Sequence, residues 1–144
     1  MRELHIGRLI DHVHLRARDL ETTKRFYRAV LGALGRPISA DDERHLACDE
    51  LWIDALSNEL GKDQRHTSHV HLALQAQDRD AVRRFYKAGL AAGGRDNGEP
   101  GERSYHPGYF GAFLLDPDGN SIEAVHHGPA ERSAESIVIR AQVP

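Results

Sequence analysis

The stretch Asp11-His12-Val13-His14-Leu15-Arg16 alternates polar and apolar residues along its length. A period of two predicts a strand with one buried face, here over residues 10–17. The apolar members Val13, Leu15 and Ala17 fall on that face. The other face then carries His12, His14 and Arg16. Two histidines on one face of a strand that borders a core suggest a functional site.

The same pattern returns at Ser68-His69-Val70-His71-Leu72, again with two histidines on one face. Each copy precedes an amphipathic helix pattern, and the helix centres are similar: Lys24-Arg25-Phe26-Tyr27-Arg28-Ala29 and Arg83-Arg84-Phe85-Tyr86-Lys87-Ala88. His12 lies 23 positions before Gly35, and His69 lies 25 positions before Gly94. The chain is therefore an internal duplication with a two-residue insertion.

Signals at the ends of the predicted helices support this division. Asp19 is a favourable N-cap for the first helix, and Gln77 or Asp78 for the second. Gly35 and Gly93-Gly94 are suited to ending them. Further strands are predicted within residues 38–56, most clearly at 50–55, and at residues 109–115 and 121–126 around the turn Asp116-Pro117-Asp118-Gly119. Residues 95–100 are turn-rich, and a short strand within them remains open. Residues 130–144 have no strong period, so a tail, a short helix and an edge strand remain open there.

One helix followed by several strands in each copy predicts an α+β fold rather than a doubly wound sheet or a helical bundle. Each helix covers one face of a small sheet, and the second faces of the two sheets enclose a cavity. We predict a single domain over residues 1–144, with a first module over about 8–57, a linker over about 58–66, a second module over about 67–128 and a C-terminal tail over 129–144.

Composition and charge indicate which partners and which cell compartment to expect. The 144 residues carry a formal net charge of -3, which gives no reason to expect nucleic acid or an anionic membrane as a partner. No apolar run approaches the roughly 20 residues that a membrane helix requires, and the N-terminus does not begin a signal peptide. The single cysteine, Cys48, favours a reducing compartment, so we expect a cytoplasmic protein.

Polar residues of both copies are expected to face the cavity. The first copy contributes His12, His14 and Arg16 from its opening strand and Trp52 and Asp54 from its closing strand. The second contributes His69, His71 and Glu123. Two histidines and one or two carboxylates match the ligand preferences of a divalent transition metal. Of the other histidines, His5, His45 and His66 are expected to face solvent.

Three motifs together resemble the vicinal oxygen chelate superfamily, which contains glyoxalase I, the extradiol dioxygenases and the fosfomycin and bleomycin resistance proteins. They are Asp11-His12-Val13 through Asp19-Leu20-Glu21, then Phe26-Tyr27 through Val30-Leu31-Gly32, and Asp116-Pro117-Asp118-Gly119-Asn120 followed by Ile122-Glu123. The resemblance covers roughly residues 8–128. It implies two βαβββ modules that form an open, incomplete barrel around a metal, and a homodimer.

The resemblance also implies a ligand set. His12 matches the first metal histidine, His69 the second, and Glu123 the glutamate of the final strand. Asp54 lies where glyoxalase I has a further glutamate, and its side chain is one methylene shorter, so it is either a ligand, a neighbour of the ligands or a base. The metal would be Fe, Ni, Zn, Mn or Co.

The resemblance leaves the chemistry open between a lyase or isomerase and a dioxygenase that acts on a small substrate chelated through vicinal oxygens. Glu123 or Asp54 would move a proton in the first case, and His14 or His71 in the second. Residues 95–109 resemble a small-protein subgroup of the superfamily. The predicted substrate contacts are Arg16, Trp52, Asn97, Tyr105, His106 and Tyr109. The alternative from another class is a metal-free binding protein that sequesters a small molecule.

Overall fold

The structure is a computed structural model that describes residues 2–6, 9–56 and 69–141. The predicted linker, residues 58–66, lies outside the described residues. The elements in chain order are β1 (Arg2–Ile6), β2 (Val13–Ala17), α1 (Leu20–Ala33), β3 (Ala40–Asp41), β4 (His45–Cys48), β5 (Leu51–Ala55), β6 (His71–Gln75), α2 (Arg79–Ala91), β7 (Arg95–Glu102), β8 (Phe110–Leu115), β9 (Ser121–His126) and β10 (Ile137–Ala141).

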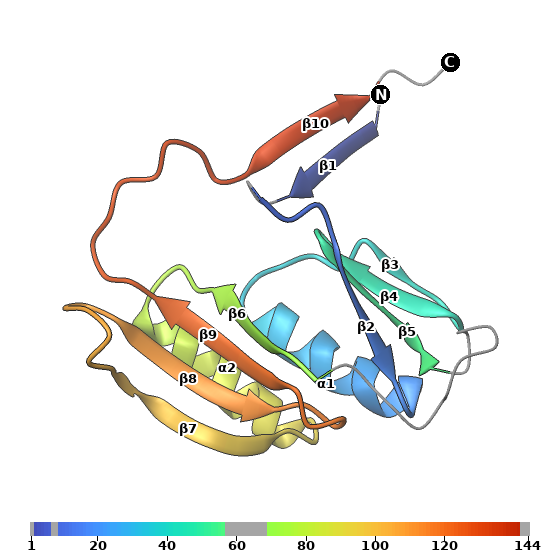
Figure 1. Ribbon diagram of the computed structural model, residues 1–144, viewed down its shortest axis with the longest axis horizontal. Helices are drawn as coiled ribbons and strands as arrows, with labels where there is room; N and C mark the ends of the chain where they lie inside the picture. The colour runs from blue at the N-terminus through green and yellow to red at the C-terminus, as the bar shows by residue number, and fades with distance from the viewer. Residues whose placement is uncertain (1, 7–8, 57–68, 142–144) are drawn as a thin grey trace.

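Two four-stranded sheets with one helix each make up the body of the molecule (Figure 1). The strand order is β2-β5-β4-β3 in the first sheet and β6-β9-β8-β7 in the second, so the two units have the same topology. In each, the opening strand runs parallel to the closing strand, and the other pairs are antiparallel. The sheets are open and do not close into a barrel. The predicted α+β fold is confirmed.

The helix ends follow the predicted chemistry. Asp19 accepts a hydrogen bond from the backbone N–H of Thr22 at 3.1 Å, and Asp78 accepts one from Ala81 at 2.7 Å. Gly35 and Gly93 follow the two C-caps with φ of 71° and 99°. A residue with a side chain is strained in this left-handed conformation, which explains glycine at both places. Neither helix in the described part of the chain is long and apolar enough to cross a membrane.

Two regions, β7 and β1, differ from the sequence-based prediction, and a third, β10, settles an alternative that the sequence left open. Residues 95–102 form a full edge strand, β7, because two register irregularities absorb its glycines and proline. Residues 137–141 form an edge strand, β10, which was one of the three alternatives left open for residues 130–144. Its partner β1 was not predicted, and the two pair antiparallel as a ribbon set apart from both sheets (Figure 1).

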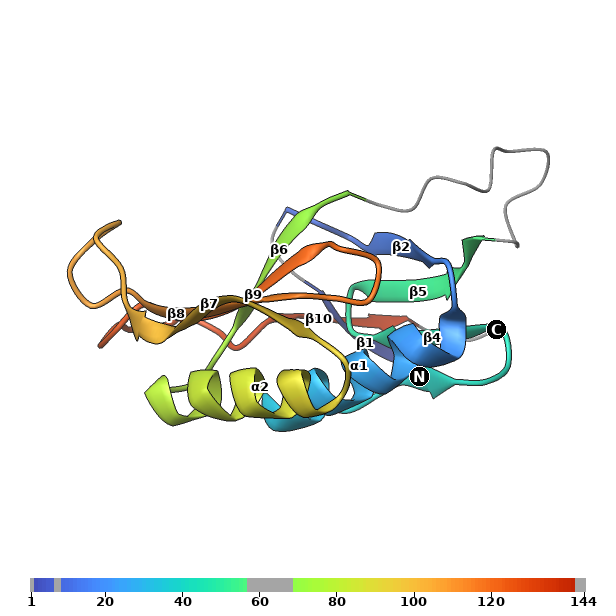
Figure 2. The same cartoon turned by 90° about the horizontal axis from the view of Figure 1, so that it is seen from below.

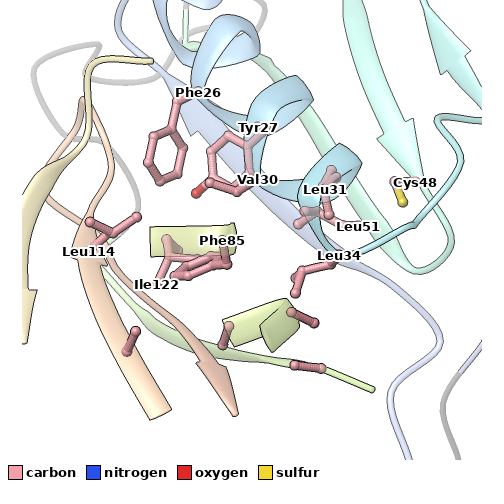
Figure 3. Close-up of a cluster of buried hydrophobic side chains, with 14 of the residues drawn as sticks. Phe26, Tyr27, Val30, Leu31, Leu34, Cys48, Leu51, Phe85, Leu114 and Ile122 are labelled. Atoms are coloured by element: carbon pink, nitrogen blue, oxygen red, sulfur yellow. The ribbon is translucent and has the colours of Figure 1, made fainter. Parts of the chain in front are cut away.

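Both helices lie on the same side of the two sheets (Figure 2). Their apolar faces join the inner sheet faces in one continuous core, part of which is shown in Figure 3. Phe26, Tyr27 and Phe85 are fully buried there. At Gly89, α2 approaches both β8 and α1 closely: a Cβ atom would lie 2.2 Å from Leu114 Cδ1 and 3.0 Å from Val30 Cγ1. The helices thus leave the opposite face of each sheet uncovered.

The Asp116-Pro117-Asp118-Gly119-Asn120 turn connects the two units. Asp116 is buried and accepts a hydrogen bond from the Tyr27 hydroxyl of α1 at 2.6 Å. Asp118 accepts one from Thr23 Oγ1 at 3.2 Å. Asn120 Oδ1 in turn accepts from the backbone N–H of Val70 at 3.0 Å. The turn therefore binds the first helix to the second sheet, in addition to reversing the chain.

Candidate functional site

The uncovered face of the first sheet carries a histidine–carboxylate pair. The parallel register of β2 and β5 aligns His14 with Trp52 and Arg16 with Asp54. His14 Nε2 lies 2.7 Å from Asp54 Oδ1, and Arg16 donates to the same oxygen at 3.4 Å. Asp54 therefore has a cationic neighbour as well as a histidine.

An aromatic stack adjoins this pair. The rings of His45 and Trp52 are parallel, 4.1 Å apart, and the His14 ring meets Trp52 edge-on. The expectation that His45 faces solvent was wrong: it is half-buried and lies opposite Asp54 across β4 and β5. Sequence reasoning missed it because the register of β4 is set by tertiary pairing. Trp52 remains 40% exposed and is free to contact a ligand.

The second sheet repeats the arrangement at the equivalent positions. His71 Nε2 lies 2.9 Å from Glu123 Oε1. The Tyr109 hydroxyl donates to the other oxygen, Oε2. Glu123 is only 3% exposed, whereas the His71 side chain is half-exposed, and Phe113 packs edge-on against the His71 ring. The buried carboxylate thus faces the open side of the sheet, where an imidazole and a phenol contact its two oxygens.

Aromatic and histidine rings gather beside Glu123. His106 Nε2 lies 2.8 Å from Nδ1 of His127, and the two rings are stacked. Tyr109 meets both rings edge-on and meets Tyr105 in the same manner. The structure therefore groups three predicted substrate contacts, Tyr105, His106 and Tyr109, with His127. Asn97, the fourth residue predicted from this region, donates instead to Ser121 Oγ at 3.3 Å.

His12 and His69 lie just before β2 and β6, and both are exposed. His12 Nδ1 is 2.7 Å from Asp11 Oδ1. Among residues 2–6, 9–56 and 69–141, no three histidine, cysteine, aspartate or glutamate side chains are close enough to hold one metal ion. Within one chain, the predicted ligands His12, Asp54, His69 and Glu123 therefore do not form one metal-binding cluster, and the metal assignment stays a prediction.

The residue types still fit a metal. Imidazole and carboxylate are ordinary ligands of divalent transition metals. Glu123 is a buried carboxylate whose bonded neighbours, His71 and Tyr109, carry no fixed positive charge. A Cβ atom at Gly111 would lie 3.1 Å from Glu123 Oε2, so this glycine makes room for the carboxylate.

Two cavities of about 410 and 590 Å³ lie elsewhere, against the C-terminal segment. Both are lined by Arg36, Gln75, Arg132 and Glu135. Neither is lined by His14, Asp54, His71 or Glu123, so the two histidine–carboxylate pairs lie on open faces of the sheets and outside these cavities.

Solved structures of other proteins have the same fold. A glyoxalase/bleomycin resistance protein from Albidiferax ferrireducens T118 is 31% identical, with a TM-score of 0.68 over 82% of this chain and 98% of that chain. A glyoxalase/bleomycin resistance protein/dioxygenase family enzyme from Burkholderia phytofirmans PsJN is 22% identical, with a TM-score of 0.63 over 81% and 97%. A lactoylglutathione lyase from Agrobacterium tumefaciens is 20% identical, with a TM-score of 0.59 over 83% and 93%. No curated protein sequence matches the chain.

A sequence profile decides the family. The profile of the Glyoxalase/Bleomycin resistance protein/Dioxygenase superfamily matches residues 9–124, which include both histidine–carboxylate pairs and the turn that joins the units. The chain belongs to the glyoxalase/bleomycin resistance protein/dioxygenase superfamily.

Proposed function

We propose that the protein is a metal-dependent enzyme that acts on a small substrate through two adjacent oxygens, as a lyase or isomerase or as a dioxygenase. The observation that carries this proposal is the pair of equivalent histidine–carboxylate contacts, His14 with Asp54 and His71 with Glu123, on open sheet faces. The repetition of this pair at equivalent positions of both units supports a functional role.

The metal ligands in this proposal are His12, His69 and Glu123, with Asp54 as the fourth candidate. A bound divalent metal would supply Lewis acidity that stabilises negative charge on the substrate oxygens. Because one chain keeps the two halves of this set apart, we propose a homodimer in which the open face of one unit meets the open face of another. This part of the proposal is supported by the uncovered sheet faces.

Proton transfer is assigned to the histidines beside the carboxylates. Asp54 orients the His14 ring by accepting from one ring nitrogen, and Glu123 does the same for His71. Histidine is the commonest general acid or base in enzymes, and an oriented ring is suited to that role. Arg16 would balance an anionic substrate group, and Trp52 with Tyr105 and His106 would contact the rest of the substrate. The proposed location is the cytoplasm.

Metal content tests the proposal most directly. We expect the purified protein to hold a stoichiometric transition metal, and His12→Ala and His69→Ala to lose it. Glu123→Gln keeps the shape of the side chain but removes its charge, so activity should be abolished. His126→Ala, a change outside the proposed ligand set, is the matched histidine control and should keep the metal. A metal-free wild-type protein would contradict the enzyme proposal.

Two assays separate the candidate reactions. Oxygen-dependent cleavage of catechols would indicate a dioxygenase, and turnover of the hemithioacetal of methylglyoxal and glutathione would indicate a lyase. The second candidate function, metal-free sequestration of a small molecule, is favoured by the exposed aromatic side chains of Trp52 and Tyr105. It would be supported by ligand binding that survives both chelation and the His12→Ala change.

A further inference from the structure

Comparison of the two units shows how differently the equivalent carboxylates are held. Each accepts a contact from the histidine of its opening strand, His14 or His71. The second donor differs. In the first sheet it is the guanidinium of Arg16, which the register places beside Asp54. In the second sheet the register places Ala73 beside Glu123, and that position supplies no cation.

Tyr109 replaces the missing donor. Its hydroxyl reaches Glu123 Oε2 from the residue just before strand β8, whereas Arg16 lies in the opening strand of its own unit. The donor is a phenol hydroxyl, which carries no positive charge. A neutral hydrogen bond orients a carboxylate without neutralising its charge, whereas a guanidinium does both.

The ring of Tyr109 is itself held in place. It meets Tyr105, His106 and His127 edge-on, with ring centres 4.9, 5.4 and 5.2 Å away. The backbone N–H of Tyr109 donates to the His106 carbonyl at 3.2 Å, and the Tyr109 carbonyl accepts from Arg103 N at 3.0 Å. His106 Nδ1 also lies 2.9 Å from the Pro107 carbonyl oxygen, which fixes the loop that supports the ring. The hydroxyl is therefore presented to Glu123 in one orientation.

Gly111 provides the space that this arrangement of Glu123 and Tyr109 needs. Oε2 lies over Gly111, where any side chain would crowd both the carboxylate and the Tyr109 ring. We propose that Tyr109 is a positioning residue for Glu123: its hydroxyl fixes Oε2 and leaves Oε1, with the full carboxylate charge, directed to the His71 side. This inference rests on the proposed function for its catalytic meaning, but the contact itself can be tested without metal.

The first experiment uses the metal-free protein. Tyr109→Phe keeps the ring and removes only the hydroxyl, and Tyr86→Phe on α2 is the matched control. The ¹³C resonance of the Glu123 carboxyl, assigned with Glu123→Gln, is compared in the variants at one pH. We expect this resonance to shift in Tyr109→Phe and to stay in place in Tyr86→Phe. An unchanged resonance in Tyr109→Phe would overturn the proposal, whether or not the protein binds metal.

The second experiment measures Ni²⁺ affinity by calorimetry. Loss of a group that orients a metal ligand typically weakens metal binding by about 10–100-fold. We expect such a decrease for Tyr109→Phe, no change for Tyr86→Phe, and in the active enzyme a fall in kcat with KM nearly constant. Equal affinity in Tyr109→Phe and wild type would overturn the positioning role. A wild-type protein that binds no metal would instead remove the proposed function, while the carboxyl resonance still decides the Tyr109 contact.

Discussion

At the scale of single residues, the two halves of the duplication use equivalent positions differently. Asp54 shares its Oδ1 atom with His14 and Arg16, whereas Glu123 is bonded by His71 and by a phenol. The longer, buried and unneutralised Glu123 is better suited than Asp54 to the proposed role of metal ligand. The shorter Asp54, next to a guanidinium, is better suited to orient His14.

Gly111 allows a test at this scale. A methyl group at Gly111 would lie 3.1 Å from Glu123 Oε2 and 3.2 Å from Tyr109 Cε1, so the carboxylate must move. Small displacements of a catalytic group cost up to about 100-fold in rate. We expect Gly111→Ala to lower kcat and metal affinity at least about tenfold.

Gly101 is the register partner of Gly111 on β7 and supplies the control. A methyl group there meets chiefly the flexible end of Arg103. Gly101→Ala should therefore leave kcat near the wild-type value. Equal effects of the two substitutions would show that the Gly111 result reflects the strand and not the carboxylate.

At the scale of elements, α1 makes polar contacts with both units. Its Tyr27 reaches the Asp116 turn of the second unit, while Lys24 and Arg28 bind Asp41 of β3. The Lys24 side chain is almost fully buried, so its ammonium requires these oxygen partners. The helix is therefore fixed by polar contacts at its edges as well as by its apolar face.

Asp41 predicts a pH dependence. Its hydrogen bonds from Arg28 and Lys24 hold the pKa of the carboxyl well below its usual range. A carboxyl whose pKa is lowered by folding stabilises the fold above its unfolded pKa of about 3.9, and this stability is lost as the pH falls further. Asp41→Asn should therefore destabilise the protein more at pH 7 than at pH 3.

Urea unfolding at the two pH values measures this difference. Asp80→Asn breaks an exposed pair with Arg83 and should change the free energy of unfolding by less than about 1 kcal/mol at pH 7. If Asp41→Asn lost the same free energy at both pH values, the ionised form of Asp41 would not be what stabilises α1 against β3.

The helix contact gives a second prediction at this scale. At Gly89 a Cβ atom would lie 2.2 Å from Leu114 Cδ1 and 3.0 Å from Val30 Cγ1. Overpacking of this kind costs about 1–3 kcal/mol or more. Gly89→Ala should lower the free energy of unfolding by that amount, despite the better helix propensity of alanine.

Gly32 of α1 is the matched control, because nothing lies within 4 Å of its missing Cβ atom. Gly32→Ala should stabilise the protein by about 0.5–1 kcal/mol. Both values come from denaturant unfolding of the whole chain. A stabilised Gly89→Ala variant would mean that α2 does not approach β8 and α1 as closely as described.

At the scale of the whole molecule, the two units place their helices together and leave two sheet faces uncovered (Figure 2). The predicted ligands divide between these faces, with His12 and Asp54 in the first unit and His69 and Glu123 in the second. If the site forms between chains, each site of a homodimer combines halves from two copies.

Complementation tests this arrangement. His12→Ala and Glu123→Gln each damage a different half, and we expect both proteins to be inactive alone. After they are unfolded and refolded together, half of the dimers are mixed, and each mixed dimer has one intact site. We expect the mixture to regain about a quarter of wild-type activity. No recovery, with mixed dimers demonstrated, would indicate that each site forms within one chain.

The sequence by itself determined the duplication, both helices with their caps, the opening and closing strands of the two sheets and the faces that carry His14 and His71. These features depend on periodicity and on local backbone chemistry, which neighbouring residues fix. It also supplied the family resemblance, which the profile match confirmed.

Only the tertiary structure decided which side chains meet. The pairing of His14 with Asp54, the stacking of His45 on Trp52 and the bond from Tyr109 to Glu123 all depend on strand register. The β1–β10 ribbon and the Tyr27–Asp116 contact join residues far apart in the chain. Such contacts depend on how the sheets and helices pack. The periodicity of the sequence does not predict them, because it reports only local structure.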